Sequence, residues 1–262
     1  MSNNSFSTVM VIGGIDPSGG AGISIDCAAV RSMGMHCAAV CSLDTVQDGA
    51  SFRSSTPASV KRVSMAIESV LEVQDVRAIK VGALGREEMV MLVAGMAARD
   101  GSPRLVVDPV MESSSGGELL DEGGIAAMRD HLIPVAGVVT PNLSEASRLL
   151  GEPVEDLEAM RSAAERIVEM GAGAALVKGG HLEGDPRDVL AIRGEKTEVM
   201  TGARLGNGDV RGTGCALASM IACGIAAGRG SAQAVRDARI RLRRAIGDSY
   251  SAGTGPRFLR FA

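Results

Sequence analysis

A run of small residues, 211–215 (RGTGC), precedes a long apolar stretch of the chain. Small residues at the start of a helix leave backbone N–H groups open to a ligand, and the helix dipole adds positive potential there. Such an array of amides can hold a phosphoryl group while charge develops on its oxygens. Cys215 would lie in the first helical turn, where the pKa of a thiol falls. The alternative is a plain helix start, with Cys215 in the core like Cys223.

A second glycine-rich segment, residues 13–22 (GGIDPSGGAG), ends where helical periodicity begins. Glycine lets the backbone approach a ligand closely, and the following helix again offers N–H groups. The segment is not a Walker A loop, because no GK[ST] follows, and it lacks the usual GxGxxG register. A tight strand-to-helix turn without a ligand is the alternative. Asp26 lies one helical turn further on and by itself would be a surface carboxylate.

Polar side chains also follow three short apolar segments. Asp108 comes directly after one and is well placed to bind a metal or a substrate hydroxyl. Asn142 and Glu145 are three positions apart, so both can face one pocket and orient Mg²⁺ through oxygens or waters. Helix capping by Ser144 and Glu145 is the alternative. Lys178 leaves a strand into a Gly-Gly turn and could reach phosphates, unless it simply ends the strand.

Short apolar segments alternate with helical ones along the whole chain, and these elements must position the polar residues. We predict strands at 9–13, 38–43, 78–81, 105–107, 137–139, 174–177 and 189–192, and helices at 21–33, 57–71, 86–99, 119–132, 144–150, 157–170, 212–228 and 232–250. Continuous apolar strands separated by helices predict a parallel sheet buried on both faces. In a doubly wound sheet, ligands bind at the carboxyl ends of the strands.

The chain shows no linker and no internal repeat, so we predict a single α/β domain over residues 1–262. Its sheet should be doubly wound and mainly parallel, flanked by helices, and residues 1–7 are expected to be disordered. A (β/α)₈ barrel is the alternative. It is disfavoured because the last third of the chain holds two adjacent helices rather than strand–helix pairs.

The composition excludes several classes of protein. With 262 residues, 45% hydrophobic and 22% charged, the chain suits a globular domain. A net charge of −4 without a long basic run argues against nucleic-acid binding. Arginines at 236–244 predict a solvated helix face, with an anion-binding patch as the alternative. The longest apolar run, 215–227, is too short to span a bilayer. Five cysteines without CxxC, and no signal-like start, predict a cytoplasmic protein.

Taken in order, the motifs resemble one family. GGIDPSGGAGISID, Gln47, KVGALG, VVDPVM, TPNLSEA, VKGGH and RGTGCALAS are similar to the hydroxymethylpyrimidine/phosphomethylpyrimidine kinases of thiamine synthesis, within the ribokinase superfamily. The match runs from about residue 8 to residue 250, and DPSGGAGI together with a Cys-bearing GTGC is its most specific part. The resemblance implies a ribokinase-like fold, ATP with Mg²⁺ and a pyrimidine substrate that is phosphorylated twice. It also implies a homodimer.

The resemblance assigns roles to individual residues. It implies that the substrate is bound by Gly14, Asp16, Ala21, Asp26, Gln47, Ala83 and Val110. It implies that ATP and its phosphates are contacted by Lys178, Asn142 and Arg211, and the metal by Asp108 and Glu145. The catalytic group would be the anion hole Gly212, Thr213 and Gly214, with Cys215 beside the acceptor oxygen. Most ribokinase relatives have Asp at the position of Cys215.

The chain departs from the family pattern mainly on the substrate side. Gln47 is followed by Asp48 and Gly49 instead of NT, Ala83 replaces Met, and residues 112–116 (ESSSG) lack the lysine of the usual AKSG. Arg211 stands where His or Asn-rich residues are frequent, and it could replace the positive charge missing at position 114. Two alternatives therefore stay open: a related vitamin kinase that acts on pyridoxal or pyridoxine, and a non-catalytic relative that only binds a pyrimidine.

Cysteine at position 215 suits a site that handles two different acceptors. A hydroxymethyl group must lose a proton during attack, so a base helps. A monophosphate is already anionic at neutral pH, because its second pKa is about 6. An Asp beside it would repel it, whereas a mostly neutral thiol would not. We expect Cys215→Ala to impair phosphorylation of the alcohol more than phosphorylation of the monophosphate.

Overall fold

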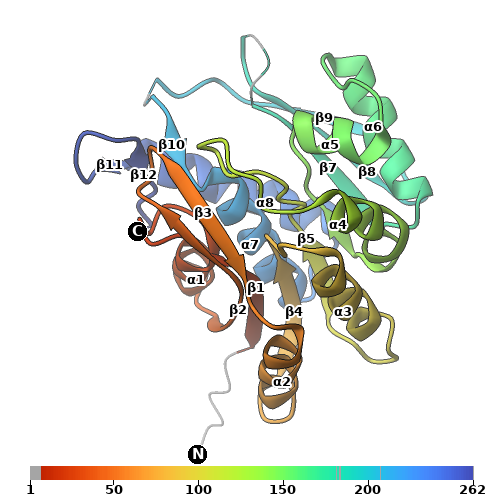
Figure 1. Cartoon of the computed structure of the whole chain (residues 1–262). Coiled ribbons are helices and arrows are strands. Elements are labelled where there is room, and N and C mark those ends of the chain that lie inside the picture. Colours follow the sequence, from red (N-terminus) through yellow and green to blue (C-terminus); the bar gives the residue numbers. More distant parts are fainter. Residues whose placement is uncertain (1–6, 181, 183, 207, 262) are drawn as a thin grey trace, which may run out of the picture.

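The computed structural model describes residues 7–180, 182, 184–206 and 208–261. The expected disorder of residues 1–7 therefore falls outside the described residues, except at position 7. Within the described chain, one nine-stranded sheet runs through the molecule in the order β3-β2-β1-β4-β5-β6-β7-β8-β9, with helices on both faces (Figure 1). The free edges at β3 and β9 rule out the closed barrel.

The central strands pair in parallel and the outer ones do not. The parallel strands are β1 (Thr8–Ile15), β2 (His36–Gln47), β4 (Val76–Val81), β5 (Arg104–Val107), β6 (Val138–Val139) and β7 (Ala174–Gly179). The antiparallel additions are β3 (Phe52–Pro57), β8 (Arg187–Ile192) and β9 (Glu198–Thr201). The prediction of a doubly wound, mainly parallel α/β sheet is confirmed.

The helices cover the two faces of the sheet unequally. One face carries α1 (Gly22–Ser32), α7 (Thr213–Ala226) and α8 (Ser231–Gly247). The other carries α2 (Val60–Leu71), α3 (Glu87–Ala97), α4 (Glu122–Ala127), α5 (Leu143–Leu150) and α6 (Leu157–Glu169). Within β1, Val9 and Val11 pack on the first face, and Met10 and Ile12 on the second. A strand buried on both faces needs this continuous apolar run.

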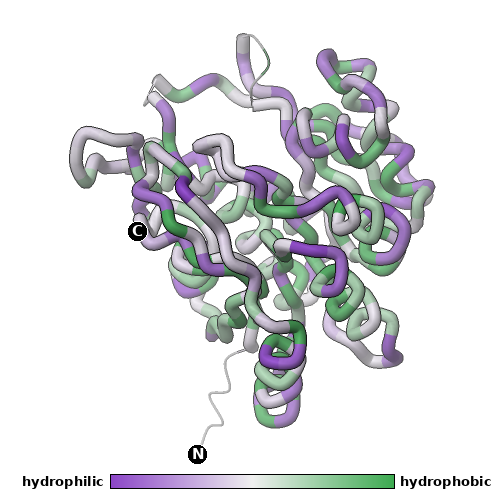
Figure 2. Tube along the Cα trace, in the orientation of Figure 1, coloured by the Kyte–Doolittle hydropathy of each residue, from purple (hydrophilic) through white to green (hydrophobic). Residues whose placement is uncertain are grey.

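Helix α2 illustrates how the outer helices form. Apolar residues recur every three to four positions along it between polar ones, which is the pattern of an amphipathic helix (Figure 2). Val63 and Ile67, four positions apart, are its buried residues. The helix begins at Val60 rather than at Pro57, because Pro57 ends β3 and the Ser59 side chain caps the helix by accepting from Arg62 N.

Other predicted boundaries also change. The helix predicted at 119–132 is α4 followed by a π-helical turn, Met128–Leu132, and a 3₁₀ turn, Ile133–Val135. Asp121 sets its start, since its carboxylate accepts from Gly124 N. No helix in the described part of the chain is long and apolar enough to cross a membrane.

A small second sheet that the sequence did not suggest joins two glycine-rich segments. Its strands are β10 (Val210–Arg211), β11 (Tyr250–Ser251) and β12 (Arg257–Phe258), with β12 in the middle. A Cβ placed on Gly20 would lie 2.7 Å from the Phe258 ring. Gly212 has φ +73°, and a Cβ there would meet the Gly20 carbonyl oxygen at 2.1 Å. The segment 13–22 and the segment 211–215 therefore touch through their backbones.

Candidate active site

A cavity of about 900 Å³ opens at the carboxyl ends of the central strands. This is where a doubly wound sheet is expected to bind its ligands. All predicted site residues except Asp26 line it: Gly14, Asp16, Ala21, Gln47, Ala83, Asp108, Val110, Asn142, Glu145, Lys178, Arg211, Gly212, Thr213, Gly214 and Cys215. The parallel topology thus brings together motifs that lie far apart in the sequence.

The start of α7 forms one wall of the cavity. Gly212 precedes the helix in a left-handed conformation and has no side chain that could cap the first turn. The amides of an uncapped first turn lack intrahelical partners. They therefore offer hydrogen bonds to a ligand, with the helix dipole behind them. The start of α7 is therefore open to a ligand, and its use as an anion site stays a prediction.

The Cys215 thiol differs from its predicted state. Burial raises the pKa of Cys215 to about 12, although the nearby Lys80 charge opposes this shift. The expectation of a lowered pKa is therefore wrong, because burial, together with the charges of Asp108 and Asp26, outweighs the effect of Lys80. Cys215 still lines the cavity and is half-buried, whereas Cys223 is fully buried in the core. The thiol at position 215 is thus neutral near pH 7.

An ion pair faces the α7 amides. Lys178 Nζ lies 2.8 Å from Asp108 Oδ1 and 4.0 Å from Glu145 Oε2. It also lies only 3.1 Å from the place that a Cβ on Gly214 would occupy, so glycine there lets the ammonium approach the helix start. Burial opposes ionisation of Asp108, but the charges of Lys178 and Lys80 prevail and lower the pKa of Asp108. A positive side chain and backbone amides therefore converge on one point.

Asn142 and Glu145 combine capping with a place in the cavity wall. Asn142 Oδ1 accepts from Glu145 N at 2.8 Å, and Glu145 Oε2 accepts from Asn142 N at 2.7 Å, which is a capping box. Burial raises the pKa of Glu145 to about 7, and Lys178 opposes that shift. The helix is therefore capped as the alternative expected for Glu145, but the capping partner is Asn142 rather than Ser144. Asn142 and Glu145 both still line the cavity.

The carboxylates fit a metal ion that arrives with a ligand better than a resident one. Among the described residues, no group of three or more His, Cys, Asp and Glu side chains could hold a metal by itself. Asp108 and Glu145 line the same cavity, with Asn142 between them in the chain. Mg²⁺ keeps several waters and binds through one or two carboxylates plus substrate phosphates. These oxygens suit such an ion.

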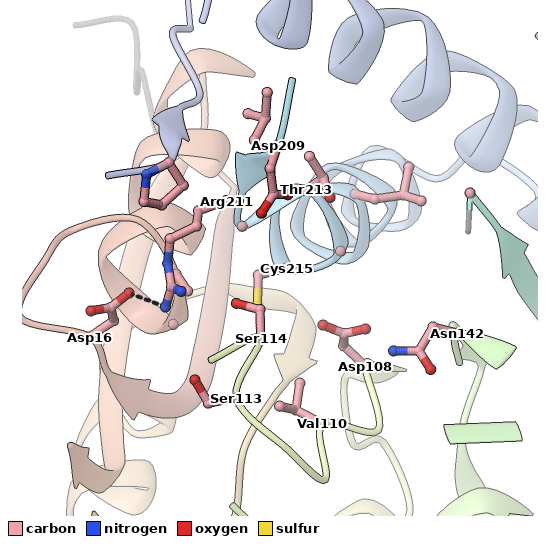
Figure 3. Close-up of a pocket in the computed structure, with 18 of the residues that line it drawn as sticks. Asp16, Asp108, Val110, Ser113, Ser114, Asn142, Asp209, Arg211, Thr213 and Cys215 are labelled. Atoms are coloured by element: carbon pink, nitrogen blue, oxygen red, sulfur yellow. Dashed lines mark hydrogen bonds and ion pairs between the residues drawn. The ribbon is translucent and has the colours of Figure 1, made fainter. Parts of the chain in front are cut away.

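Arg211 points to the other end of the cavity. Its Nη2 lies 3.2 Å from Asp16 Oδ2 and 3.0 Å from Gln47 Oε1, and its Nη1 donates to the Gly49 carbonyl at 2.8 Å. In the view of Figure 3, Cys215 lies between this group and Asp108. Its guanidinium thus joins Asp16, Gln47 and Gly49, and a contact between Arg211 and a phosphate stays a prediction.

The prediction that Asp26 binds the substrate also needs correction, since Asp26 does not line the cavity. It is fully buried, with Lys80 Nζ 2.8 Å from Oδ2 and Ser219 Oγ 2.8 Å from Oδ1. Burial raises the pKa of Asp26 and Lys80 opposes this shift. A buried carboxylate needs such partners. Lys80 does line the cavity, and a lysine inside an apolar strand was the signal that sequence reasoning missed.

Some arginines of α8 also reach the cavity. Arg236 is exposed and pairs with Glu198, as a solvated helix face predicts. Arg239 and Arg243 are half-buried and line the cavity instead. Arg239 Nε donates to Asp188 Oδ2 at 2.9 Å. These two arginines therefore do not lie on a solvated helix face, and anion binding by them stays a prediction. His181 of the VKGGH motif lies outside the described residues.

Comparison with known proteins decides the family. The model of the phosphomethylpyrimidine kinase family matches residues 16–259. The chain belongs to this family. A hydroxymethylpyrimidine/phosphomethylpyrimidine kinase of Streptomyces coelicolor is 37% identical over 94% of this chain and 91% of its own length. The predicted family is confirmed, and with it the prediction of an enzyme of the kinase class.

Solved structures agree with this placement. A phosphomethylpyrimidine kinase of Clostridium difficile is 30% identical, with a TM-score of 0.80, over 92% of this chain and 99% of its own. A pyridoxal kinase of Staphylococcus aureus in complex with AMP-PCP and pyridoxal is 27% identical, with a TM-score of 0.88, over 97% and 93%. The ribokinase-like fold is thereby confirmed. The family thus has relatives that bind nucleotides.

Proposed function

We propose that this protein transfers the terminal phosphoryl group of ATP to hydroxymethylpyrimidine and then to the resulting monophosphate. One observation carries the proposal. A single cavity has the uncapped start of α7 and the Lys178–Asp108 ion pair at one end and the Arg211–Asp16 pair at the other, with Cys215 between them in Figure 3. The family to which the chain belongs, and the names of its relatives, supply the substrate class.

The phosphate end provides positioning and charge rather than covalent chemistry. The amides of Gly214 and Cys215 would hold the oxygens of the phosphoryl group, and Lys178 would balance their charge. Asp108, Asn142 and Glu145 would hold Mg²⁺ together with ATP. The ion would neutralise phosphate charge when it is bound. Lys178 is already held in place by Asp108, so its ammonium needs little reorganisation.

Cys215 lies where the acceptor oxygen would approach the phosphoryl group. As a neutral thiol it does not repel a monophosphate, which an aspartate at this position would do. When the acceptor is the alcohol, Cys215 can take up its proton only as a thiolate. The buried Lys80 charge favours the thiolate. The two phosphorylation steps should therefore depend differently on this residue and on pH.

A coupled assay of ADP release tests the proposal, with hydroxymethylpyrimidine and its monophosphate supplied separately. We expect ADP formation with each acceptor, and phosphorylated products by mass spectrometry. Lys178→Met serves as the low-activity reference, because it leaves the acceptor end intact. Pyrimidine binding without ADP release from either acceptor would instead support the non-catalytic alternative.

A pyridoxal kinase is the second candidate function. The specific observation is that pyridoxal kinases of Staphylococcus aureus and Bacillus subtilis match this fold with TM-scores of 0.87–0.90. Ala83, where the resembling family has Met, also leaves room for another ring. The same assay with pyridoxal and pyridoxine decides between the two. A higher kcat/KM for pyridoxal than for hydroxymethylpyrimidine would favour this candidate.

A cytoplasmic location and a homodimer stay predictions. The five cysteines form no CxxC pair, which supports a reducing compartment. Light scattering of the purified protein tests the dimer, and localisation of a tagged chain tests the compartment.

A further inference from the structure

The amide of Gln47 at the acceptor end can adopt only one orientation. Arg211 Nη2 lies 3.0 Å from one terminal atom of this amide. An arginine can donate hydrogen bonds but never accept them, so the facing atom must be the carbonyl oxygen Oε1. Ser113 Oγ lies 3.0 Å from the same oxygen and can donate to it as well. The two ends of a glutamine amide are otherwise hard to tell apart.

The opposite end of the amide gives the same answer. Gln47 Nε2 lies 2.9 Å from Thr45 Oγ1, and this hydroxyl donates to the Ile15 carbonyl at 2.7 Å. Because its proton is used there, the Thr45 oxygen is left to accept from Gln47. The chain of donors therefore runs in one direction, from Arg211 through Gln47 and Thr45 to the backbone of β1.

One hydrogen of Gln47 Nε2 is left over after these contacts, and Gln47 lines the cavity. We propose that Arg211 acts as a specificity-determining positioning residue that fixes Gln47 so that it presents an N–H donor to the acceptor substrate. The pocket would then select a ring that offers an unprotonated nitrogen at this point. A ring that offers N–H or C–H there would be rejected. This inference rests on the proposed function for its substrate class.

Gln47 is held by an ion pair, Arg211 with Asp16, that is unusually buried for charged side chains. Asp16 is 2% exposed and Arg211 is 5% exposed, so their pair has left water almost completely. Arg211 Nε is buried and finds no hydrogen-bond partner among the described residues. A buried ion pair contributes little net stability, and fixing a particular geometry is its best-attested use. Here the ion pair fixes the orientation of the Gln47 amide, so that its N–H donor faces the cavity.

Binding measurements test this inference without requiring turnover. Calorimetry would compare hydroxymethylpyrimidine with its two deaza analogues, in which one ring nitrogen or the other is replaced by C–H. For the wild-type protein we expect one analogue to bind about tenfold more weakly than the parent, the size of a lost hydrogen bond. In Gln47→Leu this discrimination should disappear. In Arg211→Met it should shrink, because only Thr45 and Ser113 then hold the amide, and their hydroxyls can rotate to accept either orientation of it.

A charge variant adds a readout that a purely structural role would not move. In Gln47→Glu, with Arg211 retained, the donor is replaced by a carboxylate oxygen. The wild type should bind the pyrimidine more weakly as pH falls and the ring is protonated. Gln47→Glu should show the opposite trend. If Arg211→Met does not fold, the loss of discrimination in Gln47→Leu and the reversed pH trend in Gln47→Glu still test the inference.

Arg166→Met is the matched control, because Arg166 pairs with Glu152 on the surface and lies outside the cavity lining. It should keep the full discrimination. Equal binding of the parent and both analogues by the wild type would overturn the inference. So would a folded Arg211→Met protein with unchanged discrimination. Failure of the proposed function would look different, since hydroxymethylpyrimidine would then bind without being phosphorylated.

Discussion

The two ends of the cavity are built in different ways. At the phosphate end, backbone amides from one short segment meet a single lysine, Lys178. At the acceptor end, Arg211 joins side chains that lie 164 and 195 positions away in the sequence, Gln47 at the end of β2 and Asp16 directly after β1. The first end needs small residues and one charge. The second depends on a mutual fit of several side chains, so substrate choice can change while phosphoryl transfer is retained.

The largest effect is expected from a substitution that disrupts only the phosphate end of the cavity. Lys178→Met should lower kcat by about 10²–10³-fold for both acceptors, the effect of losing one oxyanion donor. The dissociation constant of hydroxymethylpyrimidine should stay unchanged, because Lys178 does not touch the Arg211 network. Steady-state rates and calorimetry check this prediction. A loss confined to one acceptor would mean that the two ends are not separate.

Cys215, at the junction of the two ends, should separate the acceptors. Cys215→Ala should lower kcat for the alcohol by about 10²-fold, the usual size of base catalysis, and kcat for the monophosphate by less. Since the pKa of Cys215 is about 12, thiolate increases throughout the accessible alkaline range. The alcohol rate of the wild type should therefore keep rising above pH 7, and the monophosphate rate should level off. Equal losses for both acceptors would contradict this role.

A glycine substitution tests the contact between the two loops. Gly212→Ala adds a Cβ 2.1 Å from the Gly20 carbonyl oxygen, at φ +73°. Strain of about 1–3 kcal/mol should lower Tm by roughly 2–10 °C and reduce kcat for both acceptors. Gly194→Ala is the matched control, because Gly194 has φ +79° but no atom within 4 Å of its added Cβ. A similar Tm loss in both variants would show that the loop contact is unimportant.

The smallest expected effect concerns Mg²⁺ and pH. The pKa of Glu145 is raised to about 7, so this carboxyl is increasingly protonated below that pH. The Mg²⁺ concentration needed for half-maximal rate should rise several-fold between about pH 7.5 and 6. In Glu145→Gln this pH dependence should be lost. A raised carboxyl pKa also means that the stability contribution of this group is present below pH 4.5 and is lost as pH rises through 7.

The sequence predicted the phosphate end better than the acceptor end. Asp108 directly follows β5 and Lys178 lies near the end of β7, and the parallel topology brings such positions together. The place of Arg211 could not be predicted, because it depends on the short strands β10 and β12, which have no continuous apolar run. Asp26 was misplaced for a similar reason, since its partner Lys80 lies 54 positions away.

A crystal structure with AMP-PCP and hydroxymethylpyrimidine tests the division of the cavity most directly. We predict the terminal phosphate at the amides of residues 212–215 beside Lys178, and a ring nitrogen within hydrogen-bond distance of Gln47 Nε2. Cys215 should lie between the two ligands. A terminal phosphate remote from the start of α7, or a pyrimidine bound away from Gln47, would contradict the account.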